Sequence, residues 1–221
     1  MEETLTFSGS ASFATDYFGN QRTFKTVSFI NSRLPSRIMH LQVDILYQRG
    51  IYPEEDFEVI NKHNARVMTT VNKELEKYVA DVMSQVKDWI LENVIQKLVL
   101  LIQSVETGET VERWQFDIKA KNSNEDGQLI SLAKESEKFD REFRATIRQI
   151  TASVSFLPEL TEKCTINIQV YTDKSVLGNE KWSTGDVALI KGGGEHMRLK
   201  TLSTSAHQVE TFVAYQLKDN Y

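Results

Sequence analysis

The apolar residues of this chain recur with a helical period in some segments and with a strand period in others. Between residues 72 and 90 they recur at steps of three and four, which predicts a helix that buries one face and has Asn72 as its N-cap. The buried positions of this helix are Leu75, Val79, Val82, Val86, Trp89 and Ile90. An earlier helix is expected to stop at Gly50, because Pro53 follows shortly after it.

Other segments alternate apolar and polar residues, or are apolar throughout, and are predicted to be strands. Residues 95–104 form a nearly continuous apolar run, as in a strand buried on both faces, and residues 111–119 form a hairpin with it. The remaining predicted strands are residues 4–8, 164–171, 197–203 and 208–217. Together these elements predict one α+β domain over residues 1–221, with a central antiparallel sheet covered by three helices on one face.

A long helix is predicted over residues 136–157, ending before Pro158. Its expected core face comprises Phe139, Phe143, Ile147, Ile150, Val154 and Leu157. The opposite face combines Arg148, Gln149 and Phe156 with small residues, and arginine and aromatic residues are enriched at protein interfaces. The alternative is a solvated face with a single exposed phenylalanine, which is also common. The pattern alone does not separate these two interpretations.

The chain after residue 171 differs in character from the rest. Glycine-rich loop separates the strand 164–171 from the next predicted strand, so the pairing of the last strands is weakly fixed in register. We expect a mobile C-terminal strand pair that pairs with either edge of the sheet, and an edge left exposed accepts an added peptide strand. A plain C-terminal hairpin is the alternative. Trp182 falls within the loop region and is expected to need a docking pocket.

Composition and charge exclude several classes of function. The formal net charge is −5 and lysine and arginine are scattered, so the chain has no basic footprint for a nucleic acid. The single Cys164 cannot form an internal disulfide and is expected to be a small buried hydrophobe in a reducing compartment. The N-terminus lacks the apolar core of a signal peptide, and no apolar run approaches the ~18–20 residues that span a bilayer. We therefore expect a nuclear or cytosolic protein.

Catalytic constellations are absent from the sequence. The four histidines, His40, His63, His196 and His207, have no metal-ligand spacing, and no HExxH, GxSxG or P-loop motif occurs. The sequence "KGGGE" lacks the Lys-Ser/Thr that follows a phosphate loop and is interpreted as a flexible turn. We therefore predict no enzymatic activity, no metal and no cofactor. A hydrolase built on dispersed carboxylates is the competing interpretation from a different class.

Several longer motifs closely resemble the HORMA-domain family of spindle assembly checkpoint proteins, the mitotic arrest deficient two family. In chain order these motifs are "LYQRGIYP", "QVKDWI", "GETVERWQFDI", "IRQITASVSFLPEL", "YTDK" and "EKW". The resemblance covers residues 4–18 and 43–217, nearly the whole chain. The accessory subunit of translesion polymerase zeta, a related HORMA protein, is a poorer match because it lacks the "RWQFDI" and "IRQIT" segments.

The resemblance implies a switch between an open and a closed fold. In the open form the C-terminal segment, the safety belt (residues 172–221), covers the edge of the strand 164–171. In the closed form it crosses the sheet to the far edge and displaces the N-terminal strand, and a partner peptide is locked on the vacated edge. The residues implied are Ile166, Ile168, Val170 and Tyr171 at the peptide-binding edge, Trp182 in the belt, and Arg148, Gln149 and Phe156 at an open–closed dimer contact.

The resemblance also implies partners and a place of action. The expected partners are peptide motifs of the mitotic arrest deficient one protein and of the anaphase-promoting-complex activator, and a second copy of the chain. The implied function is to inhibit that activator until kinetochores attach, in the nucleus, at the kinetochore and in the cytoplasm. The alternative is a HORMA adaptor subunit in DNA repair or in meiotic chromosome complexes.

One segment departs from the family pattern. Residues 19–42 contain Pro35 and no clean apolar period, where the family's first helix runs unbroken. We interpret them as an atypical insertion in the first helix, either a surface loop or a translated intron.

Overall fold

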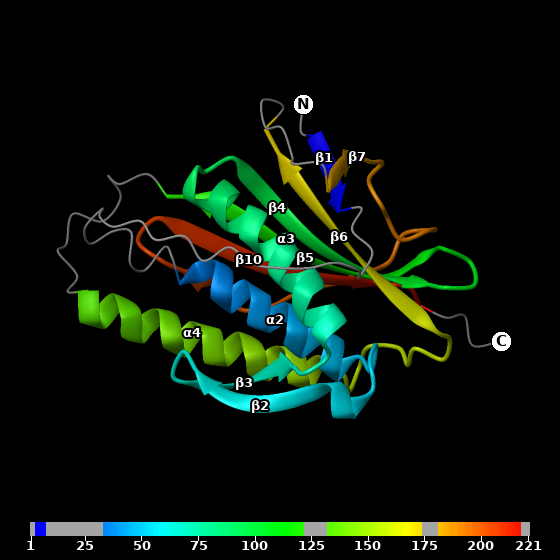
Figure 1. The fold of residues 1–221 in the computed structure, drawn as a ribbon, viewed down its shortest axis with the longest axis horizontal. Coiled ribbons are helices and arrows are strands. Elements are labelled where there is room, and N and C mark those ends of the chain that lie inside the picture. Colours follow the sequence, from blue (N-terminus) through cyan, green and yellow to red (C-terminus); the bar gives the residue numbers. More distant parts are fainter. Residues whose placement is uncertain (1–2, 8–32, 122–131, 174–180, 218–221) are drawn as a thin grey trace.

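The computed structural model describes residues 3–7, 33–121, 132–173 and 181–217, which form a large sheet with helices on one face (Figure 1). The helices are α2 (Leu34–Gln48), α3 (Lys73–Leu91) and α4 (Leu132–Ser153), with a single 3-10 turn, η1 (Glu54–Asp56). The strands are β1 (Glu3–Phe7), β2 (Phe57–Lys62), β3 (Ala65–Thr70), β4 (Ile95–Ser104), β5 (Thr110–Ala120), β6 (Cys164–Thr172), β7 (Trp182–Thr184), β8 (Glu195–Arg198), β9 (Leu202–Ser203) and β10 (His207–Tyr215). The predicted α+β class, with three helices on a central antiparallel sheet, is confirmed.

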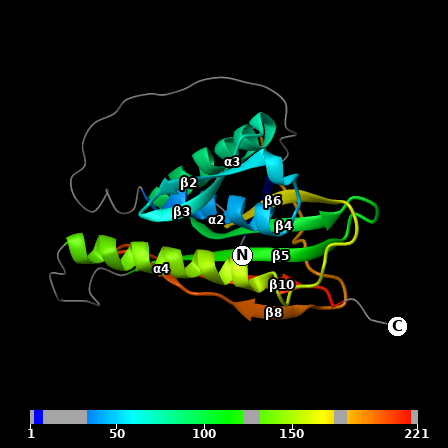
Figure 2. The ribbon, with the colours of Figure 1, turned by 90° about the horizontal axis from the view of Figure 1, so that it is seen from below.

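The main sheet has eight strands in the order β7-β1-β6-β4-β5-β10-β8, with β9 paired to β10 beside this path. All of its pairs are antiparallel. The apolar run of β4 reflects two covered faces, as predicted. Leu98 and Leu100 lie in the core beneath the helices, whereas Val99 and Leu101 lie in a second cluster on the opposite face. Figure 2 shows the three helices together on one side of β4, β5 and β10.

The helix α3 follows its sequence prediction closely. The Asn72 side chain accepts hydrogen bonds from the backbone N–H groups of Glu74 and Leu75, at 3.1 and 3.2 Å, so the predicted N-cap is confirmed. All of the predicted core positions of this helix are buried. Trp89, which the sequence placed in the core, is 2% exposed, and Trp114 of β5 is 0% exposed.

The predicted long helix is confirmed in type but not in its bounds, because it begins at Leu132, four residues before the predicted start. The helix α4 ends at Ser153, and the backbone N–H groups of Phe156 and Leu157 both bond to the Ser153 carbonyl in the turn that follows. Of the expected core residues, Phe139, Phe143, Ile150 and Leu157 are buried and Ile147 is partly buried. Val154 is 37% exposed, so its assignment to the core was wrong. It lies past the last helical turn, where the helical rotation no longer applies.

The expectation that residues 19–42 lack a regular element is wrong for their second half, because α2 begins at Leu34. Pro35 lies in the first turn of α2, where a missing backbone N–H leaves no hydrogen bond unmade. The apolar period is unclear because α2 is covered on nearly all sides. The β2–β3 hairpin packs on the outside of α2: the His40 ring lies 3.3 Å from the Met68 carbonyl oxygen, and Ser36 bonds to His63 at 3.0 Å. Residues 19–32 lie outside the described residues.

The predicted C-terminal strand 197–203 is wrong as a single element. It divides into β8 and β9, both paired with β10. The interruption has a local cause, because Leu199 turns into the core and the backbone N–H of Lys200 donates to the Gln149 side chain of α4 at 2.5 Å. The Cys164 thiol donates to the Glu162 carbonyl at 3.5 Å, and the residue is half-buried rather than fully buried as expected. Among the described residues, no helix combines the length and apolar character that crossing a bilayer requires.

Burial of α2 traps polar groups between the sheet and the β2–β3 hairpin. The Arg37 guanidinium, 0% exposed, pairs with Asp140 and stacks 4.2 Å from the Phe139 ring centroid. Asp44 is 4% exposed, and in the described part of the chain its Oδ2 atom has no hydrogen-bond partner. Burial raises the pKa of Asp44 from 3.8 to about 7. Burial also lowers the pKa of His40 to about 4.

We expect Asp44→Asn to stabilise the protein at pH 8 and to have much less effect at pH 5. The folded pKa of Asp44 lies above its unfolded value, so its favourable contribution is complete below about pH 4 and is lost as the pH rises through about 7. The expected gain at pH 8 is roughly 2–4 kcal/mol, because each pKa unit corresponds to ~1.4 kcal/mol. The lowered pKa of His40 makes the stability of the protein rise with pH between about 4 and 6.5. The informative quantity is therefore the difference in the free energy of unfolding between the variant and the wild type.

Chemical denaturation at both pH values measures this difference. Asp88→Asn, at an exposed position of α3, is the matched control and should change the free energy of unfolding by about 0.5 kcal/mol or less. If Asp44→Asn changes the free energy of unfolding equally at pH 5 and pH 8, the raised pKa of Asp44 is contradicted.

Candidate functional site

The strand β6 carries the predicted peptide edge, and its two sides are paired unequally. β4 pairs with β6 from Cys164 to Thr172. On the other side β1 pairs only with Gln169–Thr172. In the described part of the chain no strand lies on the outer side of Cys164–Ile168. The edge is therefore covered at one end and left without a strand partner at the other.

The four residues predicted to form this edge do not share a face. Ile166, Ile168 and Val170 point toward the helices, and Ile168 and Val170 are almost fully buried. Tyr171 points to the opposite face, where its hydroxyl accepts a 3.2 Å hydrogen bond from Arg113 and its ring centroid lies 5.2 Å from the Lys97 ammonium. A strand added to β6 therefore meets these residues chiefly through the backbone, which is how β-augmentation gives affinity.

The place beside β6 is held by the N-terminal strand β1. The register is antiparallel, with Leu5 opposite Val170 and Thr6 opposite Gln169. The resemblance implied that the N-terminal strand is displaced when the belt reaches the far edge, and that a partner peptide then pairs with β6. Here the N-terminal strand itself lies in the position expected for that peptide.

On its other side β1 pairs with β7, the first strand of the belt. Trp182 begins β7 and is 7% exposed, with its ring centroid 5.1 Å from those of Phe7 and Trp89. The Phe7 ring also lies 5.4 Å from that of Tyr78, edge to face. Burial raises the pKa of Tyr78, whose side chain hydrogen-bonds the backbone of Ile168. The docking pocket expected for Trp182 is thus built by β1 and α3.

After β7 the belt crosses the sheet face that carries no helix, and Gln169 of β6 contacts it there. The Gln169 amide nitrogen donates to the Asp186 carbonyl at 3.0 Å and to the Thr6 hydroxyl at 3.2 Å. The amide oxygen accepts from the Ala188 backbone N–H at 3.3 Å. Ala188 packs on the cluster of Val99, Leu101 and Tyr171. One side chain therefore connects β1, β6 and the belt.

The belt then reaches the far edge of the sheet. Gly192 and Gly193, with φ of +77° and +82°, turn the chain into β8, a conformation that favours glycine. β10 pairs with β5 over its nine residues, His207–Tyr215. The belt strands β7 and β10 therefore lie on opposite sides of the β6-β4-β5 core (Figure 1). This is the belt position that the resemblance implies for the closed form.

The three residues of the predicted dimer face of α4 have different surroundings in the structure. Arg148 is exposed, and Phe156 is 48% exposed in the turn beyond the helix end. Gln149 instead accepts a hydrogen bond from the Lys200 backbone N–H, so it contacts the belt. The assignment of Arg148, Gln149 and Phe156 to a dimer contact stays a prediction, now centred on Arg148 and Phe156.

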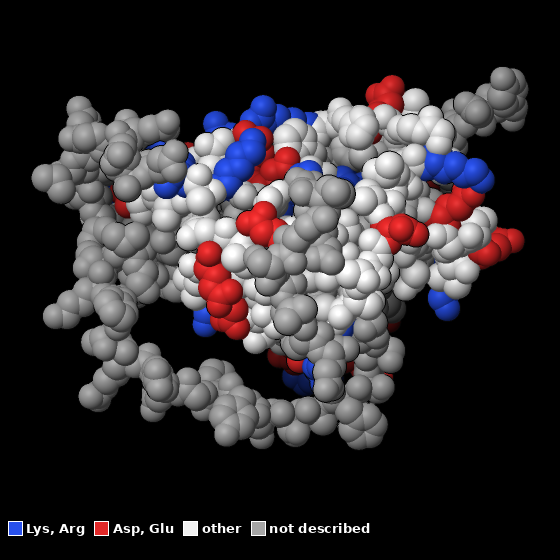
Figure 3. Space-filling model, turned by 90° about the horizontal axis from the view of Figure 1, so that it is seen from above, with Lys and Arg blue, Asp and Glu red and all other residues white. Residues whose placement is uncertain are grey.

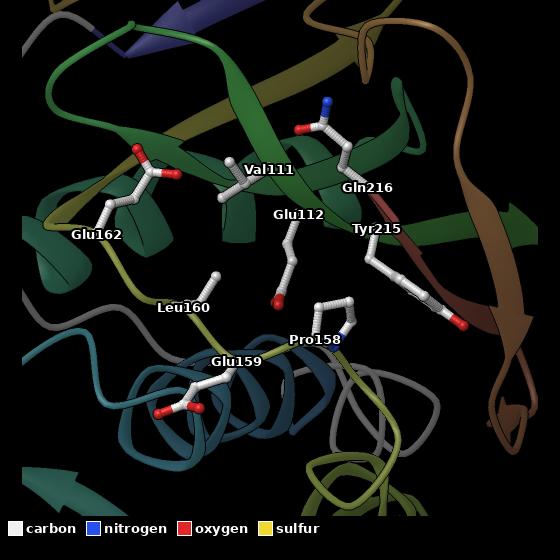
Figure 4. Close-up of a pocket in the computed structure, with 8 residues that line it drawn as sticks. All are labelled: Val111, Glu112, Pro158, Glu159, Leu160, Glu162, Tyr215 and Gln216. Atoms are coloured by element: carbon white, nitrogen blue, oxygen red, sulfur yellow. The ribbon is translucent and has the colours of Figure 1, made fainter. Parts of the chain in front are cut away.

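A small hollow lies where the beginning of β5 meets the segment after α4 (Figure 4). Its lining residues are Val111, Glu112, Pro158, Glu159, Leu160, Glu162, Tyr215 and Gln216. Glu112 is saturated by internal donors, because it pairs with Arg49 and accepts a 3.1 Å bond from the Trp114 indole. Arg49 also donates to the Pro158 carbonyl at 2.6 Å. This carboxylate therefore holds the fold together rather than serving as a free acid or base.

The surface charges give no sign of a nucleic-acid site on the face drawn in Figure 3, where basic and acidic side chains intermingle. Among the described residues, no group of three or more His, Cys, Asp or Glu side chains could hold a metal ion. The feature of the structure with the clearest binding geometry is therefore the β6 edge with the belt around it.

Sequence reasoning missed two residues of this site. Gln169 was not among the predicted site residues, because its bonds to the belt depend on tertiary structure. A Cβ atom on Gly185 would come within 2.6 Å of the Thr6 hydroxyl oxygen, so Gly185 allows the belt to approach β1 closely. A glycine that follows a short tryptophan-containing strand was the available signal for this close approach.

The comparisons with known proteins agree with this geometry. The model of the HORMA domain family matches residues 37–207. The mitotic spindle assembly checkpoint protein MAD2A of Mus musculus is 38% identical over 221 residues, covering 99% of this chain and 96% of the relative. The mitotic spindle checkpoint component mad2 of Schizosaccharomyces pombe is 38% identical over 188 residues, covering 85% of this chain and 92% of the relative.

Solved structures of HORMA proteins are also similar to this chain. A chain in the crystal structure of the mitotic checkpoint complex superposes with a TM-score of 0.77 at 34% identity, covering 85% of this chain and 99% of the other. Caenorhabditis elegans HTP-2, solved bound to a HIM-3 closure motif, superposes with a TM-score of 0.69 and covers 86% of this chain and 91% of the other, but at 15% identity it supports the fold alone. The chain belongs to the HORMA domain family and is homologous to the MAD2 spindle checkpoint proteins.

We expect Gly185→Ala to destabilise the protein by about 1–3 kcal/mol, the usual cost of overpacking. The added methyl group would lie 2.6 Å from the Thr6 hydroxyl oxygen but 3.4 Å from the Thr6 Cβ. In a Thr6→Ala background, which lacks that oxygen, the same substitution should cost much less. Thermal unfolding of the four proteins of this double-mutant cycle measures the coupling. An equal cost in both backgrounds would contradict the contact between β1 and the belt.

Proposed function

We propose that this HORMA-family chain is a non-enzymatic switch of the mitotic spindle assembly checkpoint that captures a partner peptide on the edge of β6. The observation that carries the proposal is the position of the belt. β7 lies one strand away from β6, and β10 is paired with β5 on the far side of the sheet. A strand between β6 and β7 is therefore bonded on both edges and enclosed by the segment that joins β7 to β10.

The mechanism we infer uses backbone hydrogen bonds for affinity and the pockets beneath the helices for specificity. The partner strand continues the sheet from β6, while the belt crosses the uncovered face and rejoins the sheet at β5. Moving the belt between the two edges breaks many ladder hydrogen bonds together, because β10 pairs with β5 along its whole length. The exchange between an open and a closed form is therefore slow.

The partners we propose are those of the checkpoint relatives. The captured strands come from the mitotic arrest deficient one protein and from the anaphase-promoting-complex activator, and the capture inhibits that activator until kinetochores attach. The proposed places of action are the kinetochore, the nucleus and the cytoplasm during mitosis.

The competing functions have weaker support. The relatives that match most of this chain carry spindle checkpoint names, so an adaptor in DNA repair or meiotic complexes is not favoured. A hydrolase needs a free acid or base in a pocket, whereas the Glu112 carboxylate in the hollow is already bonded to Arg49 and Trp114.

A synthetic peptide with the belt-binding segment of the mitotic arrest deficient one protein should form a slowly dissociating complex with the full chain. We expect Trp182→Ala to raise the dissociation rate at least about tenfold, because large buried aromatic side chains dominate interface energies. Lys181→Ala is the neighbouring control, since its ion pair with Asp81 is exposed and such pairs contribute little. Fluorescence anisotropy after addition of unlabelled peptide gives the rates. No complex with excess peptide, for a chain that is folded by circular dichroism, would refute the proposal.

Arg148→Ala should weaken self-association at least about fivefold while leaving peptide capture unchanged, because arginine is enriched among the residues that dominate interface energies. Arg148 is exposed on α4, so its loss should not disturb the core. Sedimentation velocity measures the association, and Lys87→Ala, at an exposed position of α3, is the control. Unchanged association of the Arg148 variant would remove this helix face from the interface.

A further inference from the structure

The strand β1 occupies the capture edge in the way a bound peptide would. It is paired with β6 on one side and with β7 on the other. A backbone hydrogen bond of 3.1 Å from Gly185 to the Thr4 carbonyl extends this pairing into the belt. A strand at a sheet margin needs only one neighbour, so pairing on both sides places β1 inside the enclosure.

The side chains of β1 alternate between two faces of the sheet, and both faces make specific contacts, as those of a bound ligand would. Leu5 and Phe7 point beneath the helices and are 4% and 5% exposed. Phe7 fills the aromatic pocket of Tyr78 and Trp182, with ring centroids 5.4 and 5.1 Å away. Thr4 and Thr6 lie on the other face, where Thr6 accepts the hydrogen bond from Gln169. The enclosure thus selects a large apolar side chain at two positions that alternate along the strand.

The covalent connection makes β1 a strong competitor for this edge. It is tethered to α2 through residues 8–33, so it returns to the edge as an intramolecular ligand. A covalent connection turns the binding of a ligand into an intramolecular event, whose effective concentration can reach the millimolar range. A partner peptide at micromolar concentration therefore competes at a disadvantage until β1 has left.

We propose that β1 is an internal occupant of the peptide-binding edge, and that the strand taken from a partner matches its pattern, with an aliphatic and an aromatic residue two positions apart. This inference rests on the proposed function of the same edge. β1 then holds the belt closed without a partner, and capture requires exchange of one strand for another within the enclosure.

The first experiment supplies β1 in trans. A chain lacking residues 1–7 should bind a fluorescent peptide of residues 1–8, "MEETLTFS", at least about tenfold more tightly than the full chain does, because the full chain's own strand competes at high effective concentration. A peptide carrying L5D and F7D is the control and should not bind. If the folded truncated chain fails to bind the wild-type peptide but captures the mitotic arrest deficient one peptide, the inference is wrong and the proposed function stands.

The second experiment keeps the chain intact, in case the truncated chain does not fold. Thr6 and Ser183 are opposite each other in the β1–β7 pair, and facing positions of antiparallel strands suit a disulfide. In a Cys164→Ser background, T6C with S183C should form a crosslink within one chain. Oxidation should abolish capture of the mitotic arrest deficient one peptide, and reduction should restore it. A crosslink between two chains, or undiminished capture by the oxidised protein, would overturn the inference.

Discussion

The unpaired backbone at the margins of the central strands is the constraint on which this structure depends. β6, β4 and β5 form the core of the sheet, and the outer edges of β6 and β5 each present a row of N–H and C=O groups that must be satisfied. In the described part of the chain the C-terminal segment acts at both margins, through β7 beside β1 and through β10 on β5. The N-terminal strand closes part of the remaining edge. The two ends of the chain thus complete a sheet that its middle leaves open.

Buried ion pairs join the helices of the helical layer to one another and to the sheet. α2 is buried between the sheet and the β2–β3 hairpin, and the Arg37–Asp140 pair joins it to α4. The Arg49–Glu112 pair joins the end of α2 to β5, and both ions are nearly fully buried. Breaking a buried ion pair is costly because it leaves an unpaired charge in a low-dielectric interior. In the proposed switch these pairs keep the helical layer attached to the sheet, and the conformational change belongs to the terminal strands.

Elements with one buried face were predictable from the sequence, because their periodicity records that face. α3, with its Asn72 cap, and β5, whose buried and half-buried residues alternate, are examples. The start of α2 was missed because a helix covered on all sides has no polar stripe. The β2–β3 hairpin was also missed. In the structure His63 and Asn64 at its tip have φ of 56° and 55°, as a two-residue hairpin turn requires.

The site was less predictable than the fold. The alternating pattern predicted the strand 164–171, but the edge with which β1 pairs depends on tertiary structure that no local pattern encodes. The close approach at Gly185 and the bonds of Gln169 arise only when that choice has been made. The family resemblance supplied the position of the belt, and the structure added the identity of the strand beneath it.

The ladders on either side of β1 also have a mechanical consequence. A strand pulled along its own axis loads its lateral hydrogen bonds simultaneously, in shear, whereas a strand peeled from one end breaks them in succession. Since β1 lies between two antiparallel neighbours, any strand in its place resists axial tension on both flanks. Such an enclosure is suited to holding a strand under axial load, because the hydrogen bonds on both flanks share that load.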